Sequence, residues 1–259
     1  MMRRVAGKVK RGIFAALHPF VVTKHRVAFG ERNHYGINPS FYTVDMANAD
    51  ACLNFNDTPR LPLQDTSVKV LFTSHALEHL SENMVSKFLE EVHRVLRPDG
   101  ILLVELPDCE RLYKAWQSGH RALFDKLGFS KEVFEQLGNI HLADRQDVAF
   151  AGIISCKIIR TRSGGEQHAP VSFRSDVFED QIRTLSMDHF FSWLISLQTQ
   201  EESLSGGHVS AWYPSKFSRT LKGAGFRESR ELSGDSRVPK FLFRGGDRKS
   251  YSFRMIAQK

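Results

Sequence analysis

A chain of 259 residues that is 41% hydrophobic and 25% charged has an ordinary globular composition, with enough apolar material for one sizeable core. Its formal net charge of +7 comes from residues 1–26, which hold seven basic side chains and no acidic one, so the rest of the chain is formally neutral. A neutral body argues against a nucleic-acid enzyme, because phosphate binding requires a basic face.

The cysteines and the N-terminal segment bear on the compartment. Cys52, Cys109 and Cys156 lie far apart without a C-x-x-C pair, which disfavours a cysteine-based zinc site and favours a reducing, cytoplasmic location. The basic N-terminal segment, residues 1–25, is interrupted by His18-Pro19 and lacks a small-residue cleavage site, so we expect a tail that leads into the domain rather than a secretory signal. Weak contact of this segment with an anionic membrane surface is an alternative.

Short apolar runs in the first third of the chain predict the strands of a parallel sheet. The four predicted strands are 26–29, 41–44, 51–55 and 68–73. The first ends at Gly30 and the second at Asp45, and the fourth carries β-branched residues on both faces.

The segment after the fourth predicted strand has the pattern of a long amphipathic helix. It begins at Ser81, and its apolar residues recur at helical spacing. The stripe comprises Met84, Val85, Phe88, Leu89, Val92, Val95 and Leu96. Pro98-Asp99-Gly100 breaks the helix, and ILLVEL at 101–106 follows as a strand whose apolar character predicts burial on both faces. Leu77, Leu80, Phe88 and Leu96 are expected in the core.

Residues 110–205 lose this regularity and are interpreted as a helical cap inserted into the domain. Helices are predicted at 111–116, 131–137 and 178–198, whereas RTRSGGEQHAP at 160–170 is typical of an exposed loop.

Regularity returns near the C-terminal end. A helix begins at Pro214, and strands are predicted at 228–232 and 250–256. The chain therefore predicts one α/β domain over residues 26–259. It is a Rossmann-like fold, with a mostly parallel sheet of seven strands flanked by helices and a helical insertion.

Two blocks of the sequence carry a family resemblance. NDTPRLPLQDTSVKVLFTSHALEHL begins at Asn56, and FLEEVHRVLRPDGILLVELPD begins at Phe88. GHVSAWYPSKFSRTLKGAGF and DRKSYSFRMIAQK add weaker support. Together they resemble class I S-adenosylmethionine (SAM)-dependent methyltransferases, closest to small bacterial members with S-H-x-L-E-H-L and R-V-L-[KR]-P-[GD]-G motifs. The resemblance implies a methyltransferase fold, SAM as the cofactor and methyl transfer as the activity.

The resemblance also assigns roles to residues at the predicted strand ends, where parallel α/β sheets bind ligands. Asp45 would accept the ribose hydroxyls of the cofactor and Asp57 its adenine amino group, while the backbone amide of Thr58 would meet the ring. Ser74 would line the cofactor pocket, and His75 would serve as a general base toward the acceptor. Asp45 and Asp57 also have a plainer interpretation as turn residues.

The loop after the first strand departs from the family pattern. Relatives have L-G-[CS]-G there, because the backbone must approach the methionyl part of the cofactor closely. This chain has Gly30-Glu31-Arg32, so Arg32 stands where a second glycine is expected. Arg32 either pairs with the cofactor carboxylate or fills its pocket. We assign Gly30 and Arg32 to the cofactor site and expect SAM to bind. A methyltransferase-like binding or scaffold protein without catalysis is the alternative.

The histidines allow a second interpretation of the same block. His75-Ala-Leu-Glu78-His79 matches H-x-x-E-H, an inverted zinc-protease motif, with both histidines on one helical face. The pattern is short and coincides with the family motif, so we expect no metal and place His79 in a hydrogen bond inside the domain. The sequence does not distinguish His120, His189 and His208 as contributors from the cap.

The predicted function is methyl transfer to a hydroxyl of a small molecule or glycan. The cap would build the acceptor pocket, although its aromatic residues, Trp116, Phe190, Phe191 and Trp193, are more often core. No nucleic-acid partner is expected, because the base-stacking N-P-P-[YF] signature is missing after the fourth strand. The sequence indicates neither the acceptor atom nor the oligomeric state.

Overall fold

A computed structural model of the protein describes residues 24–31, 40–125, 145–160, 166–200, 206–232 and 251–259. Three predictions lie outside these residues: the course of residues 1–23 in the basic N-terminal segment, the place of Arg32, and the helix at 131–137.

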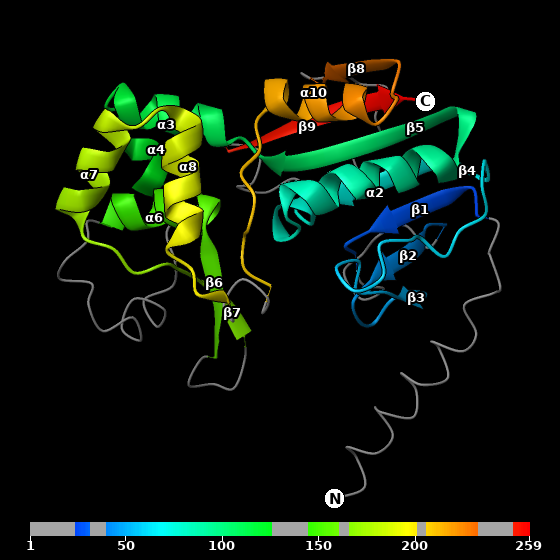
Figure 1. Ribbon diagram of the computed structural model, residues 1–259, viewed down its shortest axis with the longest axis horizontal. Helices are drawn as coiled ribbons and strands as arrows, with labels where there is room; N and C mark the ends of the chain where they lie inside the picture. Colours follow the sequence, from blue (N-terminus) through cyan, green and yellow to red (C-terminus); the bar gives the residue numbers. More distant parts are fainter. Residues whose placement is uncertain (1–23, 32–39, 126–144, 161–165, 201–205, 233–250) are drawn as a thin grey trace, which may run out of the picture.

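The described chain forms two lobes (Figure 1). The sheet lobe comprises residues 24–31, 40–108, 214–232 and 251–259, and the cap lobe comprises residues 109–125, 145–160 and 166–200. Residues 206–213, here called the linker, lead back from the cap lobe to the sheet lobe. Among the described residues, no helix is long and apolar enough to cross a membrane.

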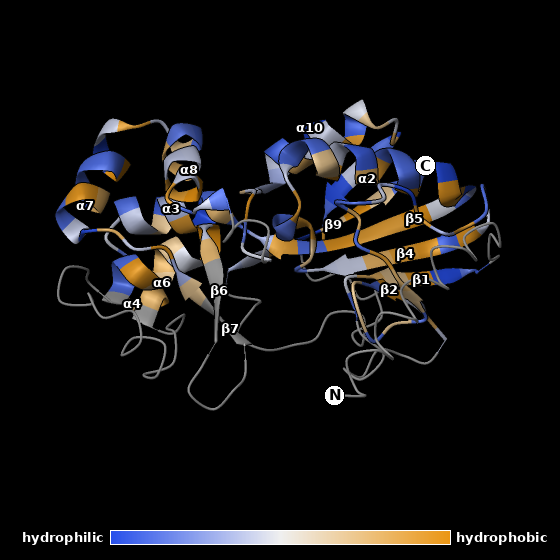
Figure 2. Cartoon of the chain, turned by 60° about the horizontal axis from the view of Figure 1, so that its bottom comes forward, coloured by the Kyte–Doolittle hydropathy of each residue, from blue (hydrophilic) through white to orange (hydrophobic). Residues whose placement is uncertain are grey.

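The sheet lobe is built on seven strands in the order β3-β2-β1-β4-β5-β9-β8. The strands are β1 (Arg26–Phe29), β2 (Tyr42–Asp45), β3 (Ala51–Cys52), β4 (Val68–Ser74), β5 (Leu96–Pro107), β8 (Glu228–Glu231) and β9 (Ser252–Gln258). The first five are parallel, whereas β9 runs antiparallel to both β5 and β8. The predicted mostly parallel seven-stranded sheet is confirmed, and β1, β4 and β5 are hydrophobic over most of their length (Figure 2).

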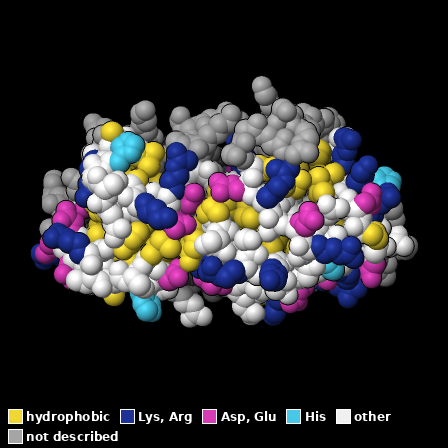
Figure 3. Space-filling view, turned by 90° about the horizontal axis from the view of Figure 1, so that it is seen from above, with side chains coloured by type: hydrophobic (Ala, Val, Ile, Leu, Met, Phe, Trp, Pro, Cys, Tyr) yellow, Lys and Arg dark blue, Asp and Glu magenta, His cyan; other side chains and the backbone are white. Residues whose placement is uncertain are grey.

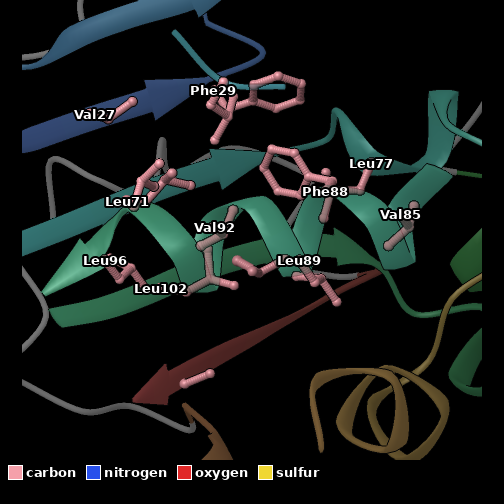
Figure 4. Close-up of a cluster of buried hydrophobic side chains, with 14 of the residues drawn as sticks. Val27, Phe29, Leu71, Leu77, Val85, Phe88, Leu89, Val92, Leu96 and Leu102 are labelled. Carbon is pink, nitrogen blue, oxygen red and sulfur yellow. The ribbon is translucent and has the colours of Figure 1, made fainter. Parts of the chain in front are cut away.

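One face of the sheet is covered by α2 (Glu82–Val95) and α10 (Pro214–Gly223). The predicted stripe of α2 is buried through Val85, Phe88, Leu89, Val92 and Val95. These side chains meet Val27 and Phe29 of β1, Leu71 of β4 and Leu102 of β5 (Figure 4). Ser81 begins the helix as predicted, with its hydroxyl accepting a hydrogen bond from the Met84 amide. Periodicity along the sequence therefore predicted this packing correctly.

The start of β5 differs from the prediction. Residues 98–100 do not lie outside the strand, because β5 begins at Leu96 and pairs with Val68, and the next pairing joins Val70 to Ile101. The extra residues form an irregularity of the bulge type within the ladder. Gly100 is required there, since a Cβ at this position would lie 2.9 Å from the Arg97 carbonyl and 3.0 Å from that of Val68.

The cap lobe has its own core, rich in aromatic rings. Its elements are α3 (Cys109–Gln117), α4 (Ala122–Asp125), α6 (Arg145–Ile154), α7 (Ser175–Thr184), α8 (Met187–Ser196), β6 (Cys156–Arg160) and β7 (Glu166–Pro170). Trp116, Phe150, Phe178 and Phe190 are buried, and the Phe178 ring centroid lies 5.4 Å from that of Trp116 and 5.3 Å from that of Phe190. The cap aromatics Trp116, Phe190 and Phe191 are thus core residues.

Two predictions in the cap were wrong in detail. The single helix at 178–198 is two helices, because Leu185 is extended and ends α7 before Ser186 begins α8. The predicted loop at 160–170 belongs in large part to a hairpin, in which β6 and β7 pair antiparallel. Neither feature has a strong local signal, since the sequence lacks a helix-breaking residue at 185–186 and alternation along β7.

Candidate active site

The candidate site lies at the carboxyl ends of the parallel strands, where the strand order reverses between β1 and β4. Gly30 follows β1, Asp45 ends β2, Ser74 ends β4 and Asp108 follows β5. The fold therefore brings to one edge four residues that are up to 78 positions apart in sequence (30 to 108).

The turn after β1 approaches the loop after β4 very closely. Gly30 has a positive φ of +76°, and its amide donates a hydrogen bond to the Val44 carbonyl at 2.8 Å. A Cβ at Gly30 would lie 2.2 Å from the Cβ of Ala76, so no other residue fits without displacing the neighbouring loop. The tight turn expected of a cofactor loop is therefore present at Gly30, and Glu31 beside it is half-buried.

The residues predicted to hold the adenosyl group lie on the surface near β2. Asp45 is partly exposed and accepts a hydrogen bond from the Met46 amide. Asp57 is exposed and accepts a hydrogen bond from the Asn54 side chain at 2.8 Å. The Thr58 amide donates to the Asn54 carbonyl at 3.0 Å, so this donor already has an acceptor within the turn.

Ser74 belongs to a buried polar network that sequence reasoning missed. Its hydroxyl donates to Glu105 at 2.9 Å, and the other Glu105 oxygen receives two hydrogen bonds from the Arg254 guanidinium at 2.8 and 2.9 Å. Glu105 is only 1% exposed. A signal existed, because Glu105 is the one charged residue in the otherwise apolar run ILLVEL and pairs in register with Ser74.

His75 is held in an uncommon conformation directly after β4. Its φ is +48°, a region that residues other than glycine rarely adopt, and its amide donates to the Glu105 carbonyl at 2.9 Å. The ring Nδ1 lies 3.2 Å from a Glu78 oxygen, and Nε2 lies 2.9 Å from the Ser252 hydroxyl. A buried carboxylate on one ring nitrogen and a hydroxyl on the other is the arrangement of an oriented general base.

Glu78 is a deeply buried acidic group whose carboxylate lies beside the His75 ring. It lies in the short 3-10 helix η1 (Leu77–His79) and is 2% exposed. Burial by itself raises the pKa of Glu78, but the contact with His75 and the charges of His75, His79 and His208 lower it, to about 2. The carboxylate is therefore ionised and holds the proton of His75 on Nδ1.

His75 and His79 do not share a helical face, so this part of the H-x-x-E-H interpretation was wrong. His75 has a positive φ and lies before η1, outside the helix, whereas His79 is its last residue. The two rings therefore point to different partners. His75 reaches Ser252 on β9, whereas His79 Nδ1 donates to the Gly207 carbonyl at 3.2 Å in the linker. His79 is hydrogen-bonded inside the molecule, as predicted.

The strand order decides the fold. With the β6–β7 hairpin of the cap set aside, the order along the sheet is third, second, first, fourth, fifth, seventh, sixth, and the seventh strand is antiparallel. This is the methyltransferase fold. The family described as "Methyltransferase domain" matches residues 21–104, about a third of the chain, and these contain Gly30, Asp45, Asp57 and His75. This segment is thus similar to a methyltransferase domain.

Several solved structures are similar over nearly the whole chain. A SAM-dependent methyltransferase from Mesorhizobium loti is 11% identical, with 96% of both chains covered and a TM-score of 0.41. A SAM-dependent methyltransferase from Archaeoglobus fulgidus is 10% identical, with 97% of this chain and 94% of that chain covered and a TM-score of 0.40. The CcbJ methyltransferase from Streptomyces caelestis is 11% identical, with 95% and 86% covered and a TM-score of 0.41. At such TM-scores the fold assignment rests on the strand order alone. No curated protein matched the sequence.

Proposed function

We propose that this chain transfers a methyl group from SAM to a hydroxyl of a small molecule or glycan. The observation that supports the proposal most directly is the position of His75. The ring stands at the carboxyl end of β4, between the buried Glu78 carboxylate and the Ser252 hydroxyl, in the loop that touches Gly30. SAM supplies the electrophilic methyl group when it is bound.

The residues at the strand ends fit the cofactor. The positive φ of Gly30 and its contact with Ala76 give the close backbone approach that a methionyl group requires. The Asp45 carboxylate, partly exposed at the end of β2, has the chemistry and the place to accept ribose hydroxyls. Asp57 and Arg32 remain our candidates for the adenine and carboxylate ends of the cofactor, and Ser74 remains our candidate for the lining of the cofactor pocket.

The proposed base acts through a defined tautomer. Glu78 keeps the proton on Nδ1, so Nε2 carries the lone pair and faces the place now taken by the Ser252 hydroxyl. An acceptor hydroxyl that replaces Ser252 as the partner of Nε2 would lose its proton to His75 as the oxygen becomes methylated. The Glu78 carboxylate then stabilises the imidazolium that forms.

Other features support a small acceptor and a cytoplasmic location. Basic and acidic side chains are interspersed on the face seen in Figure 3, without one continuous basic surface. None of the three cysteines forms a disulfide, which supports a reducing compartment.

A non-catalytic methyltransferase-like protein is the second candidate, and the connection between β1 and β2 favours it. Only residues 30–41 join these two parallel strands. That length is at the short limit for a parallel crossover, which usually holds a helix. Glu31 would also bring a carboxylate toward the carboxylate of SAM.

Calorimetric titration with S-adenosylhomocysteine separates the two candidates. We expect saturable binding to the full chain, weakened in Asp45→Ala and Asp57→Ala and unchanged in His189→Asn, which alters an exposed histidine of the cap lobe. No binding at millimolar ligand would rule out the enzyme. Unchanged affinity in both aspartate variants would mean that the pocket lies elsewhere.

The role of His75 requires a separate measurement. His75→Gln should leave S-adenosylhomocysteine affinity within about twofold but lower turnover on a hydroxyl acceptor by about 10²–10⁴-fold, the usual contribution of a general base. The pH profile of kcat should lose its histidine limb. Equal turnover in the variant would contradict the assignment of His75 as the base.

A further inference from the structure

Glu78, His79 and His208 form a cluster where the two lobes meet. One carboxylate oxygen of Glu78 and one ring nitrogen from each histidine all lie within 4.8 Å of one another. Glu78 and His79 belong to η1 of the sheet lobe, whereas His208 comes from the linker. The three residues are thus brought together only by the tertiary fold, and the motif around His75 contains just two of them.

Glu78 is the unusual member of this cluster. The residue is 2% exposed, and neither of its carboxylate oxygens accepts a well-aligned hydrogen bond. His75 Nδ1 lies at ion-pair distance from Oε1, and the remaining neighbours that favour ionisation are the rings of His79 and His208. A buried carboxylate is costly unless a positive charge and further ligands compensate it.

Both histidines are oriented as metal ligands usually are. His79 Nδ1 donates to the Gly207 carbonyl at 3.2 Å, and His208 Nδ1 donates to the Ile153 carbonyl at 2.8 Å. A carbonyl only accepts, so Nδ1 carries the proton in each ring, and the lone pair of the neutral ring is on Nε2. Metal-bound histidines typically donate their second N–H to a backbone carbonyl in this way.

The backbone around His208 is fixed from both lobes. The Val209 amide donates to the Glu78 carbonyl at 2.8 Å, and the His208 amide donates to the Cys156 carbonyl at 3.2 Å. The Gln198 side chain also donates to the His208 carbonyl at 2.5 Å. A Cβ at Gly207 would lie 2.2 Å from the Cys156 carbonyl, so this close approach depends on glycine. The ligand positions are therefore held before any ion arrives.

We propose that Glu78, His79 and His208 bind one divalent transition metal of the zinc class, which joins the linker to η1 of the sheet lobe. Two imidazoles and one carboxylate are a donor set that zinc commonly takes, with a fourth position for water. Bonds of about 2.0–2.2 Å in a tetrahedral site place ligand atoms about 3.4 Å apart, so the three atoms close by about an ångström. Glu78 has lone pairs enough to serve His75 and the metal together.

Titration of Co²⁺ into the full chain tests this proposal without any reference to methyl transfer. The affinity tag is removed and the protein is treated with a chelator first. We expect saturation at one Co²⁺ per chain with the visible d–d absorption of a tetrahedral site, displacement by Zn²⁺, and a higher Tm with Zn²⁺ than with chelator. If no stoichiometric Co²⁺ binding occurs, the proposal is overturned.

Two variants of His208 test whether this residue is a metal ligand. His208→Ala should lower Co²⁺ affinity at least about tenfold, whereas the exposed His189→Ala should leave it unchanged. His208→Cys should bind Co²⁺ with a thiolate-to-metal charge-transfer band, which appears only if residue 208 is a ligand. That spectrum decides the question even if His208→Ala fails to fold. Wild-type affinity in His208→Ala, or a His208→Cys complex without the band, would contradict the assignment.

Discussion

The two lobes are stabilised by cores of different composition. In the sheet lobe, Phe29 and mainly aliphatic side chains of β1, β4 and β5 pack under the α2 stripe, with Phe88 at the centre (Figure 4). In the cap lobe, rings from α3, α6, α7 and α8 meet around Phe178. The α2, β4 and β5 part of the first core follows from periodicity in one continuous block of sequence, residues 68–106. The second depends on contacts between helices that are far apart in the chain, which periodicity does not predict.

The largest effects are expected from removing a central ring of each core. Phe88 is fully buried, with ring centroids 4.4 Å from Phe29 and 5.5 Å from Phe55. Phe88→Ala should lower the free energy of unfolding by about 3–5 kcal/mol, measured by urea denaturation, because it leaves a cavity under β1. It should also abolish S-adenosylhomocysteine binding, since the same core supports the Gly30 turn.

Phe178→Ala is the matched variant in the cap lobe. Phe178 is also fully buried, so a similar local loss is expected, but cofactor binding should persist because Gly30 and Asp45 lie in the other lobe. Loss of cofactor binding in both variants, with one shared unfolding transition, would mean that the two lobes unfold as one cooperative unit. The two cores would then not stabilise their lobes separately.

A smaller effect is expected at two glycines with nearly the same backbone. Gly30 has φ +76° and Gly119, in the cap lobe, has φ +75°. Alanine costs about 1–2 kcal/mol in this conformation at either position. At Gly30 the Cβ also meets Ala76 at 2.2 Å, whereas nothing lies within 4 Å at Gly119. Gly30→Ala should therefore lose about 2–4 kcal/mol in total.

Calorimetric titration with S-adenosylhomocysteine distinguishes the two glycine variants by their affinity for the ligand. Gly30→Ala should weaken binding at least about tenfold, as expected for a displaced backbone at the ligand. Gly119→Ala should bind like the wild type. Equal affinities in the two variants would show that the turn at Gly30 does not contact the cofactor.

Helix starts provide a third comparison. Ser81 caps α2 by accepting from the Met84 amide, whereas Ser186 at the start of α8 makes no such bond and contacts His189 instead. Ser81→Ala should cost about 1 kcal/mol, and Ser186→Ala a few tenths. Thermal unfolding monitored by circular dichroism measures both. A larger cost at Ser186 would indicate that the cap helix depends on its side-chain contact with His189.

The smallest effect concerns Asp108, which lies between the lobes and caps α3 through the Arg111 amide at 3.0 Å. Burial raises the pKa of Asp108, an effect that Glu231 and Glu110 reinforce and the Arg111 hydrogen bond opposes. The folded state therefore binds more protons than the unfolded state, so this group's contribution falls as pH rises above the ordinary range of aspartate. Asp108→Asn should keep the cap and flatten this part of the stability profile. A steeper fall of stability with pH in Asp108→Asn than in the wild type would contradict the predicted direction of the Asp108 contribution.

The candidate site was predictable only where a residue lies at the end of a strand that the sequence pattern predicts. Gly30, Asp45 and His75 follow from β1, β2 and β4, and the structure places them at one edge of the sheet. Glu105 was missed because a lone acid in an apolar strand shows neither its partner Arg254 nor its register. Such partners come from strands that lie far away in the chain.

The cap lobe shows the same limit for the fold. Its helices α3 and α8 were anticipated from apolar spacing, but the break at 185–186 and the β6–β7 hairpin were not. Hairpins and short helices depend on what they pack against, and for the cap helices that is a core drawn from residues 109–213.

The sequence by itself determined the parallel sheet, the long helix α2 and the residues that follow the first, second and fourth strands, because each depends on local periodicity and turn chemistry. Only the tertiary structure decided the surroundings of His75. It placed Ser252 on one ring nitrogen, Glu78 on the other, and His208 of the linker beside Glu78. Contacts between segments up to 177 residues apart have no signature in local sequence, since they arise only when distant strands and loops come together in the folded chain.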